Sequence, residues 1–511
     1  MFNRPWNCGK GLALSSVLIT ALAITLACGG GGGSSSNATP TAPTKVHGTS
    51  ILRHLPFSWT THTLGTDSAP NASSLAIGAL VPAAGGGFTT VAGTYNATDG
   101  TFSVNHVPSG PYWLTFGSSD YIWTDKSQVD LGWNIGGRKD VTAATASPTN
   151  IVFSTTGMDP WTSSDYLQFF DFNARLYEMP NWDASVNWPI DGDTSLNSLT
   201  VDWANSGGIS YPLADTAKGD HPQLIQMASK PLGVETYQVA SKVYAPSSLT
   251  MTNGAGASVG GTFGAMPGAS INFAFNWKRS EFAQHQPAVN PTATTLYGEF
   301  YLDCQPGFAQ YGFINAMDLL YYFNSGDLTD LNAGTVQVPA PPQGFDLFTY
   351  AIMIFRKSYL LPGTTVASRQ YAFIQSINNT LPTSTSPVRP LVSPVLNPQL
   401  GGQSLFSDPT AVGLTPTLSW TAPATGTPTG TVIYVRELFA NGSTTTTIPV
   451  ARIYTSTNSV QLPPGVLQSG KTYNLLIRTY ASPGWDPSAA PFQAHPGSMG
   501  WADTLSGIIT P

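Results

Sequence analysis

Charged side chains are scarce in this chain of 511 residues. Lys and Arg number 21, and Asp and Glu number 28, which together make 10 % of the sequence, whereas soluble proteins have about 25 %. Only five of the acidic residues are glutamates. Because the exposed faces of long α-helices are built mainly from Glu, Lys, Arg and Gln, this composition excludes a helical bundle and a coiled coil. The sequence therefore predicts an all-β fold.

The rest of the composition supports folded domains. Hydrophobic residues make up 41 % of the chain and aromatic residues 11 %, which is enough to form packed cores and speaks against disorder. At roughly 150 residues per domain, the length corresponds to about three domains. The formal net charge is −7, which excludes a strongly basic binder, so we expect no nucleic-acid partner.

The N-terminus has the pattern of a secretory signal. Arg4 and Lys10 precede an apolar run from Leu12 to Ala27, which is shorter than the roughly 20 residues of a membrane-spanning helix. The run ends in Ile-Thr-Leu-Ala before Cys28, and five glycines follow. This resembles a bacterial lipoprotein signal with a lipidated cysteine, although that family prefers Leu where Thr25 stands. The alternative is an ordinary signal peptide in which Cys28 has no role.

The lipoprotein resemblance implies lipid attachment at Cys28, and so a membrane partner reached through the N-terminal lipid. Gly29 after the cysteine implies, in that family, the outer membrane. We therefore expect a lipid-anchored protein of the cell envelope, exposed at the surface. The Gly, Ser and Pro residues that follow predict a flexible tether, whose residues 29–45 would span about 20–25 Å.

Period-2 patterns begin after the tether. Residues 99–114 read Asp-Gly-x-Phe-x-Val-x-x-Val-Pro-x-Gly-x-Tyr-x-Leu, in which Asp-Gly is a turn dipeptide and the alternating apolar residues predict strands. The pattern resembles the carboxypeptidase regulatory-like (transthyretin-like) sandwich. The resemblance implies an accessory module without catalytic activity.

The C-terminal region contains two further signals. Leu-Ser-Trp at residues 418–420 resembles the core tryptophan strand of a fibronectin type III domain. Residues 467–473 read Leu-x-x-Gly-x-x-Tyr, which resembles the tyrosine corner, in which the Tyr473 hydroxyl would cap a neighbouring turn. The segment after Pro483 exceeds the usual pattern, and we expect it to add an edge strand.

The region between these two resembles no known family. Ile271 to Trp277 alternates apolar with small or polar residues, which predicts a half-buried strand, and Phe348 to Phe355 predicts a buried one. Asp165 to Tyr177 and Ile314 to Phe323 fit short helices or strands equally well. One large sandwich and two small ones both remain open.

Cysteine usage predicts no intramolecular disulfide. Cys8 would leave with the signal and Cys28 would be lipidated, so only Cys304 remains. Cys304 follows an alternating stretch without a catalytic signature, and we expect it to be buried and inert; a reactive thiol is the alternative.

Two motif matches do not predict a ligand-binding site. Gly465 to Thr472 fits the phosphate-loop pattern, but the following residues have strand period where that chemistry needs a helix. Asp191, Asp193 and Asp202 fit the start and end of a calcium loop, but Leu196 stands where the loop needs Gly. We expect a solvated turn, with calcium as the alternative, and we assign no metal site and no cofactor.

Catalytic signatures for acyl transfer are missing, and no catalytic residue is assigned. A glycosidase needs only two carboxylates about 5–10 Å apart. No spacing selects a pair from the candidates of the middle region, which are Glu178, Asp183, Asp191, Asp193, Glu235, Glu281, Glu299 and Asp303.

Six tryptophans are concentrated between residues 123 and 203, on both sides of the boundary between the first region and the middle region. They are Trp123, Trp133, Trp161, Trp182, Trp188 and Trp203. Buried in sandwich cores they contribute large apolar area; exposed, they would stack on the C–H faces of sugar rings. Trp161 and Trp188 adjoin prolines, which predicts loops and exposure.

These patterns predict tandem β-sandwich domains after a lipoprotein signal peptide and a flexible Gly/Ser tether. We divide the chain into a signal peptide (1–27), a lipid-anchored tether (28–48), a carboxypeptidase regulatory-like sandwich (49–155), an unrecognised β-rich region (156–390) and a fibronectin type III-like domain (391–511). We expect a binding, scaffolding or adhesion protein for a polysaccharide or a surface protein. The alternatives are a surface glycan hydrolase with its carboxylates in 156–390 and a structural spacer.

Overall fold

Strands dominate this computed structural model, which describes residues 44–180, 187–205, 208–233, 235–308, 316–324, 326–493 and 498–511. Strand accounts for 53 % and helix for 3 % of the structure, against about 20–25 % and 30–35 % in an average soluble protein. The all-β prediction is confirmed. Cys28 lies outside the described residues. None of the described helices is long and apolar enough to cross a membrane.

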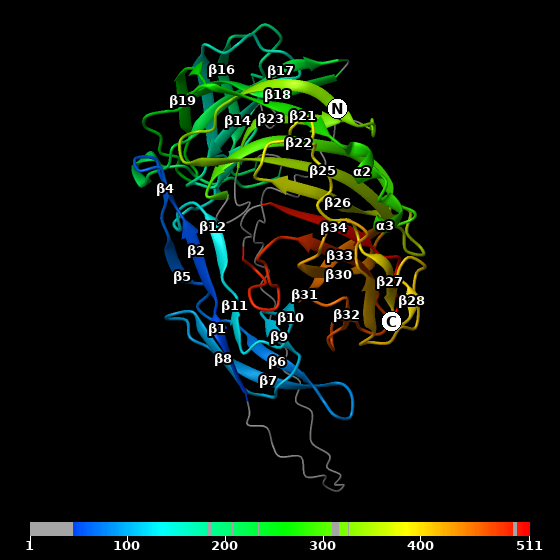
Figure 1. Cartoon of the computed structure of the whole chain (residues 1–511). Helices are drawn as coiled ribbons and strands as arrows, with labels where there is room; N and C mark the ends of the chain where they lie inside the picture. The colour runs from blue at the N-terminus through cyan, green and yellow to red at the C-terminus, as the bar shows by residue number, and fades with distance from the viewer. Residues whose placement is uncertain are drawn as a thin grey trace. The chain divides into compact units, whose positions relative to one another are not determined.

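One sheet of 20 strands runs through the described chain (Figure 1). Its strands are β1 (Thr44–Thr49), β6 (Ile77–Pro82), β7 (Phe88–Tyr95), β8 (Thr101–Val107), β9 (Tyr112–Phe116), β10 (Asp120–Thr124), β11 (Gln128–Asp130), β14 (Tyr166–Asp171), β15 (Leu176–Glu178), β17 (Gln223–Leu232), β18 (Glu235–Tyr244), β20 (Gly264–Ala265), β22 (Thr294–Pro306), β23 (Met317–Asn324), β25 (Phe345–Tyr359), β26 (Ser368–Asn378), β30 (Gly430–Asn441), β31 (Thr444–Thr455), β33 (Thr472–Ala481) and β34 (Met499–Leu505).

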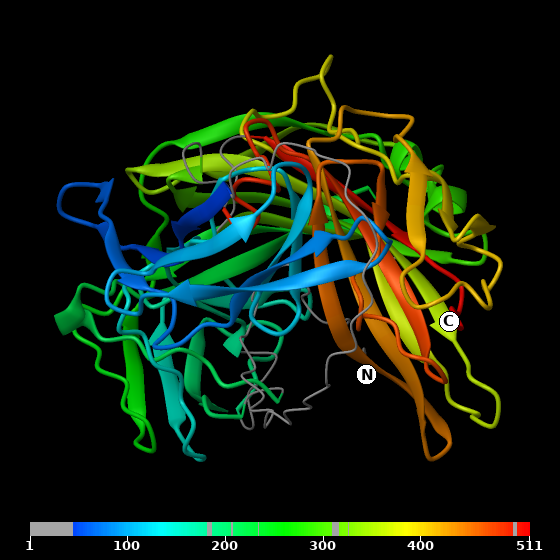
Figure 2. The ribbon, with the colours of Figure 1, turned by 90° about the horizontal axis from the view of Figure 1, so that it is seen from below.

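Hydrogen-bonded pairs give the order of the strands. It is β11-β1-β8-β7-β6-β9-β10-β31-β30-β33-β34-β26-β25-β22-β23-β18-β17-β14-β15, with β20 beside β18. The sheet is curved, as Figure 2 shows for its green, yellow and orange strands. Strands twist relative to their neighbours, and this twist accumulates across a sheet of many strands.

Smaller sheets and three short helices complete the fold. The sheets consist of β2 (Ile51–Leu55), β5 (Asp67–Pro70) and β12 (Trp133–Gly136); β3 (Phe57–Ser58) and β4 (Thr63–Leu64); β13 (Asn150–Thr156), β16 (Ser195–Asp202) and β19 (Ala257–Thr262); β21 (Ser270–Trp277) and β24 (Leu331–Pro339); and β27 (Leu396–Leu400), β28 (Gln403–Ser404), β29 (Thr417–Thr421) and β32 (Ser459–Gln461). The helices are the 3-10 helix η1 (Thr216–Lys218), α2 (Arg279–Ala283) and α3 (Gln286–Val289).

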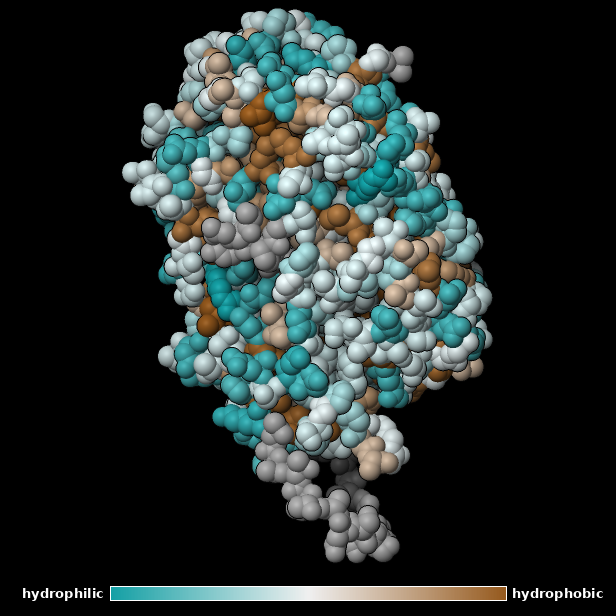
Figure 3. Space-filling view, in the orientation of Figure 1, coloured by the Kyte–Doolittle hydropathy of each residue, from teal (hydrophilic) through white to brown (hydrophobic). Residues whose placement is uncertain are grey.

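Polar residues cover most of the face drawn in Figure 3, and apolar residues appear there in small groups. Since charged residues are only 10 % of the chain, Ser, Thr, Asn and Gly supply much of this polarity. Such a surface offers many neutral hydrogen-bonding groups.

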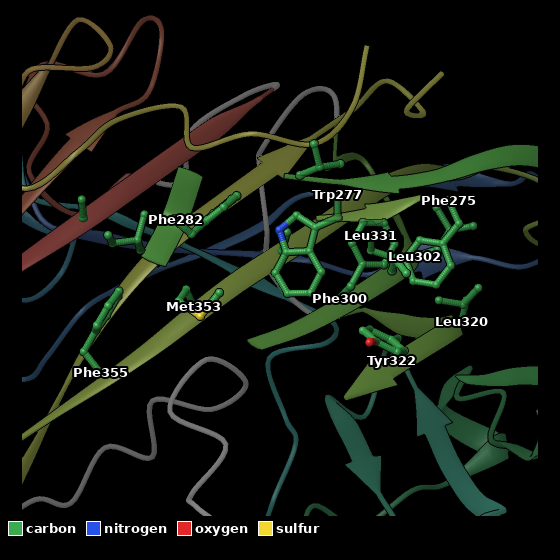
Figure 4. Packing of buried hydrophobic residues seen from close by; sticks show 14 of the residues in the cluster. Phe275, Trp277, Phe282, Phe300, Leu302, Leu320, Tyr322, Leu331, Met353 and Phe355 are labelled. Carbon is green, nitrogen blue, oxygen red and sulfur yellow. The ribbon is translucent and has the colours of Figure 1, made fainter. Parts of the chain in front are cut away.

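The largest core lies between β21–β24 and the large sheet (Figure 4). Phe273, Phe275 and Trp277 point from β21 into it, and the ring of Phe275 lies 4.7 Å from that of Phe300 on β22. The alternation predicted for Ile271 to Trp277 is confirmed. Phe348 to Phe355 is buried throughout, as predicted, because its odd-numbered residues join this core and its even-numbered ones pack on the opposite face.

Two further small sheets cover the large sheet in the same way. The sheet of β13, β16 and β19 packs on β14, β15 and β17, and the sheet of β27, β29 and β32 packs on β30, β31 and β33. The fold therefore consists of tandem β-sandwiches. The middle region contributes to several buried clusters, and its ambiguous stretches, so far as they are described, are strands β14, β15 and β23.

The N-terminal patterns form the expected hairpins. Strands β7 and β8 meet at the Asp-Gly turn, where Gly100 has a φ of 71° that only glycine adopts without strain. Val46 and Phe102 then pack against Leu114 and Ile122 across a local core.

The C-terminal signals also have the expected geometry. The backbone N–H of Gln468 donates to the Tyr473 hydroxyl at 2.9 Å, and Trp420 is buried in the core beside Leu418. Strand β33 begins at Thr472, so the phosphate-loop pattern is followed by a strand and not by a helix.

The prediction of an edge strand after Pro483 is wrong in one respect. Strand β34 exists, but it pairs with β33 on one side and with β26 on the other, so it is interior. Its Asp503 accepts two hydrogen bonds from the Arg478 guanidinium, at 2.7 and 2.9 Å. This strand continues the sheet from the C-terminal region into the middle region. The divisions drawn at residues 155 and 390 stay predictions.

Candidate ligand-binding groove

The pairing of β10 with β31 joins two segments more than 300 residues apart. The two strands run parallel, with Asp120 opposite Arg452 and Ile122 opposite Tyr454. Because neighbouring parallel strands end at the same edge, the residues that follow Thr124 and Thr455 lie close together. These following residues form one end of a groove.

A buried ion pair stabilises this pairing. The Arg452 guanidinium approaches both carboxylate oxygens of Asp120, at 2.7 and 2.8 Å, and its backbone N–H donates to the Ser119 carbonyl. Burial raises the pKa of Asp120, and the nearby Arg452 acts in the opposite direction. The pair therefore fixes the register of the two strands, and its loss would leave a carboxylate with 8 % of its side chain exposed.

The groove has a volume of about 380 Å³, and we call it the junction groove. It is lined by Pro111, Trp123, Thr124, Asp125, Lys126, Thr429, Ser456, Thr457, Trp485, Asp486 and Ser488.

Its aromatic walls are two indole rings. Trp123 is half-buried, and its ring lies 4.9 Å from that of the fully buried Trp113 on β9. Trp485 is 7 % exposed; its ring packs on Tyr480 and its N–H donates to the Ala490 carbonyl at 3.1 Å. Both rings are held in place, and Trp123 is the one with accessible surface.

Its polar groups are also ordered. One carboxylate oxygen of Asp486 accepts from the backbone N–H of Ser488 at 2.9 Å and from its hydroxyl at 2.6 Å. Asp125 and Lys126 are largely exposed side by side, with a nitrogen–oxygen distance of 3.5 Å. An exposed pair of this kind contributes little to stability, so both groups are available to a ligand.

An indole with carboxylates and hydroxyls beside it suits a sugar. The C–H face of a pyranose packs on an aromatic ring, and its hydroxyls donate to carboxylates in charge-assisted hydrogen bonds. The lining carries two carboxylates and one ammonium group, which favours a neutral ligand over an anionic one.

The structure disperses the predicted tryptophans. Trp123 lines the groove, Trp133 packs between Phe116 and Phe492, and Trp203 is fully buried. The expectation of an exposed Trp161 is wrong: although its loop adjoins Pro160, the side chain is 5 % exposed because it packs into the core under β13 and β16. Trp188 is 53 % exposed, as predicted. Trp182 lies outside the described residues.

The candidate carboxylates do not converge on the groove. Asp191 and Asp193 lie in a turn, Glu281 pairs with the Arg389 guanidinium, and Glu235 accepts from the Tyr322 hydroxyl. Burial and this hydrogen bond raise the pKa of Tyr322 to about 12. Asp183 lies outside the described residues.

Three further carboxylates lie in the large sheet. Glu178 is buried in β15, and Glu299 in β22 accepts from the Tyr301 hydroxyl at 2.7 Å. Asp303 is fully buried opposite Asp318 of β23, a residue that the sequence analysis did not select. Asp318 accepts from the hydroxyls of Tyr166 and Tyr177 at 3.1 and 2.6 Å.

The calcium-loop pattern is not a single loop. Asp193 precedes strand β16, whereas Asp202 is the last residue of that strand and accepts from the Thr149 N–H at 2.9 Å. Among the described residues, no group of three or more His, Cys, Asp or Glu side chains is placed to hold a metal ion. Cys304 is buried, as predicted.

Sequence reasoning found only one member of the junction groove, Trp123. The other walls come from residues 111–126, 429, 456–457 and 485–488. No local period connects these stretches, and only a prediction that β10 pairs with β31 would have found the site.

No known protein-family model matches the chain, and the search of curated proteins found no similar sequence. The function is therefore argued from these residues.

Proposed function

We propose that this protein is an exported, lipid-anchored protein of the cell envelope that binds neutral polysaccharide through the junction groove. The observation that carries the proposal is the half-buried Trp123 beside the ordered carboxylate of Asp486 in one groove. Ring stacking and charge-assisted hydrogen bonds together select a polyhydroxylated ligand.

The anchor is part of this proposal. Cys28 carries the lipid in the outer membrane, and the tether displays the sandwiches to extracellular ligands. Accessory modules of the carboxypeptidase regulatory-like and fibronectin type III-like kinds would supply the groove from its two sides. Changing Cys28 to Ser is expected to move the protein from the membrane fraction to the soluble fraction.

The groove is tested by co-sedimentation of the mature protein with insoluble cellulose, chitin and cross-linked dextran. Trp123→Leu keeps an apolar contact with Trp113 but removes the flat ring, and we expect binding to fall by about 10-fold or more. Trp188→Leu changes an exposed tryptophan outside the groove and serves as the matched control. Equal binding by wild type and Trp123→Leu would refute the groove as the site.

A surface glycan hydrolase is the second candidate, and it would need the Asp303–Asp318 pair, which is fully buried in this structure, to become accessible to the substrate. Directly opposed residues in antiparallel strands have Cβ atoms about 4.5–5.5 Å apart, close to the carboxylate spacing of retaining glycosidases. Release of reducing sugar in the same tubes, abolished by Asp318→Asn, would establish this function. Sedimentation without release would support the binding function.

A further inference from the structure

A second groove of the described surface lies on the N-terminal sandwich and shares no lining residue with the junction groove. It has a volume of about 580 Å³, and we call it the sheet-face groove. Its lining consists of Lys45, His47, Gly48, Thr49, Thr94, Tyr95, Asn96, Thr101, Phe102, Ser103 and Gln128. These residues come from the four neighbouring strands β7, β8, β1 and β11, except Asn96, which follows β7.

The register of these strands aligns polar side chains in a row. Thr94 lies opposite Ser103, Ser103 opposite His47, and His47 opposite Gln128. Directly opposed residues share a face of the sheet. At about 4.8 Å per strand, the row extends over about 14 Å.

A second row runs beside the first, one pleat further along. Thr101 lies opposite Thr49, and the Asn96 N–H donates to the Thr101 carbonyl. Beyond the lining of the groove the row ends at Asp130, whose carboxylate is paired with the Arg53 guanidinium at 2.5 Å. The floor is thus a regular array of hydroxyl, amide and imidazole groups.

The apolar content of the lining is small. Tyr95 is half-buried and Phe102 is 4 % exposed, so the groove lacks the protruding aliphatic or aromatic anchors of a protein–protein hot spot. The regular rows of hydrogen-bonding groups are instead complementary to a regular polyhydroxylated chain.

The charge of the lining is opposite to that of the protein. Lys45 is exposed, His47 lies two residues along the same strand, and the lining contains no carboxylate, although the whole chain has a net charge of −7. Asp99, the acidic residue of the adjoining hairpin, accepts from the N–H and hydroxyl of Thr101 at 2.9 and 2.7 Å, so its negative charge lies at the Thr101 end of the groove, while Lys45 lies four residues along β1 from Thr49, the partner of Thr101. The ammonium group of Lys45 therefore attracts an anionic ligand to its end of the groove.

We propose that the sheet-face groove binds an acidic polysaccharide, one whose repeating sugars carry carboxylates. Lys45 and His47 contact the carboxylates, and the Thr94, Ser103 and Gln128 side chains bond the hydroxyls. This inference rests on the proposed glycan-binding function and extends it to a second, oppositely charged site.

Polygalacturonate and its methyl ester test the proposal, because they share a backbone and differ in charge. The mature full-length protein, purified in detergent, is titrated with each polymer by calorimetry. We expect the acid form to bind about 10-fold or more tightly than the ester, and its affinity to fall as NaCl rises from about 50 to about 500 mM. Equal affinity for the two polymers, or no binding of the acid form, would overturn the proposal.

Two lysine variants locate the site. Lys45→Glu reverses the charge at the groove, and we expect it to weaken polygalacturonate binding by about 10-fold or more. Lys230→Glu makes the same charge change at an exposed position of β17 and is expected to alter it by less than about 2-fold. Equal losses in both variants would show a non-specific charge effect and contradict the assignment.

The design separates this inference from the function on which it rests. If the neutral polymers do not sediment the protein but Lys45→Glu still weakens polygalacturonate binding, the junction groove fails and the sheet-face groove stands. If Trp123→Leu removes binding of the neutral polymers and polygalacturonate does not bind to the wild type, the junction groove stands and the sheet-face groove fails.

Discussion

The junction groove and the sheet-face groove are built in different ways on the same sheet. The sheet-face groove uses residues between Lys45 and Gln128, which the antiparallel pairs β7–β8 and β8–β1 and the parallel pair β1–β11 bring together. The junction groove combines residues 111–126 with residues 429–488, through the parallel pairing of β10 and β31. The first groove therefore depends on local register and the second on one long-range contact.

The two grooves also differ in the charged side chains that line them. The sheet-face groove carries Lys45 and His47 without a carboxylate, whereas the junction groove carries Asp125 and Asp486 with one lysine. If both proposals hold, two sites of opposite charge on one scaffold let one molecule hold two different polymers. Damage to the structural support of one groove at a time is expected to separate the two.

Gly48→Ala is expected to have the largest effect, and on the sheet-face groove. A Cβ at this position would lie 1.7 Å from the Val129 carbonyl oxygen and 2.8 Å from the Phe102 ring, so β1 and β11 must separate. We expect a loss of about 3 kcal/mol in the free energy of unfolding, measured by urea denaturation. Polygalacturonate binding should fall while neutral-polymer binding persists.

The control for this variant is Gly85→Ala, where a Cβ meets nothing within 4 Å. A stability change in Gly48→Ala no larger than in this control would contradict the tight packing of β1 against β11.

Arg452→Ala is expected to have the next largest effect, and on the junction groove. It leaves the Asp120 carboxylate buried without its partner, and we expect a loss of about 2 kcal/mol at neutral pH. This is less than for a fully buried pair, because 35 % of the Arg452 side chain is exposed. Binding of the neutral polymer should weaken more than binding of polygalacturonate. The opposite order would contradict the claim that this ion pair supports the junction groove alone.

The same variant has a signed pH dependence. Burial raises the pKa of Asp120, and Arg452 opposes this rise in the wild type. A carboxyl group with a raised pKa binds its proton more tightly in the folded state, so stability falls as pH rises above about 4, through the folded pKa. Denaturation at about pH 5 and pH 8 should therefore show the larger loss at pH 8, and a loss independent of pH would contradict this.

Tyr473→Phe is expected to have the smallest effect. It removes the hydroxyl that accepts from the Gln468 N–H at 2.9 Å, outside both grooves. We expect a loss of about 1 kcal/mol in the free energy of unfolding, without a change in the affinity for either polymer. A change in either affinity would show that the grooves are not independent of this corner.

Local patterns predicted the local parts of the fold. Alternation at Phe273, Phe275 and Trp277 and the Asp99-Gly100 turn depend on neighbours in the chain, and the structure confirms both. The tyrosine corner at Tyr473 is likewise a short-range contact.

Pairing between distant strands was not predictable in this way. Strand β34 has no pattern that distinguishes an edge strand from an interior one, and Trp161 is buried because remote strands cover its proline-flanked loop. The candidate site was the least predictable part of the molecule, because Trp123 and Asp486 are brought into one groove only by the pairing of distant strands.

The central claim is that the two grooves bind different polymers independently. Its most direct test crosses Trp123→Leu and Lys45→Glu against both probes, polygalacturonate and the neutral polymer that sediments the wild type. We predict that Trp123→Leu loses about 10-fold in affinity for the neutral polymer alone and that Lys45→Glu loses about 10-fold for polygalacturonate alone. If either variant weakens both polymers equally, the two sites are one and the account is contradicted.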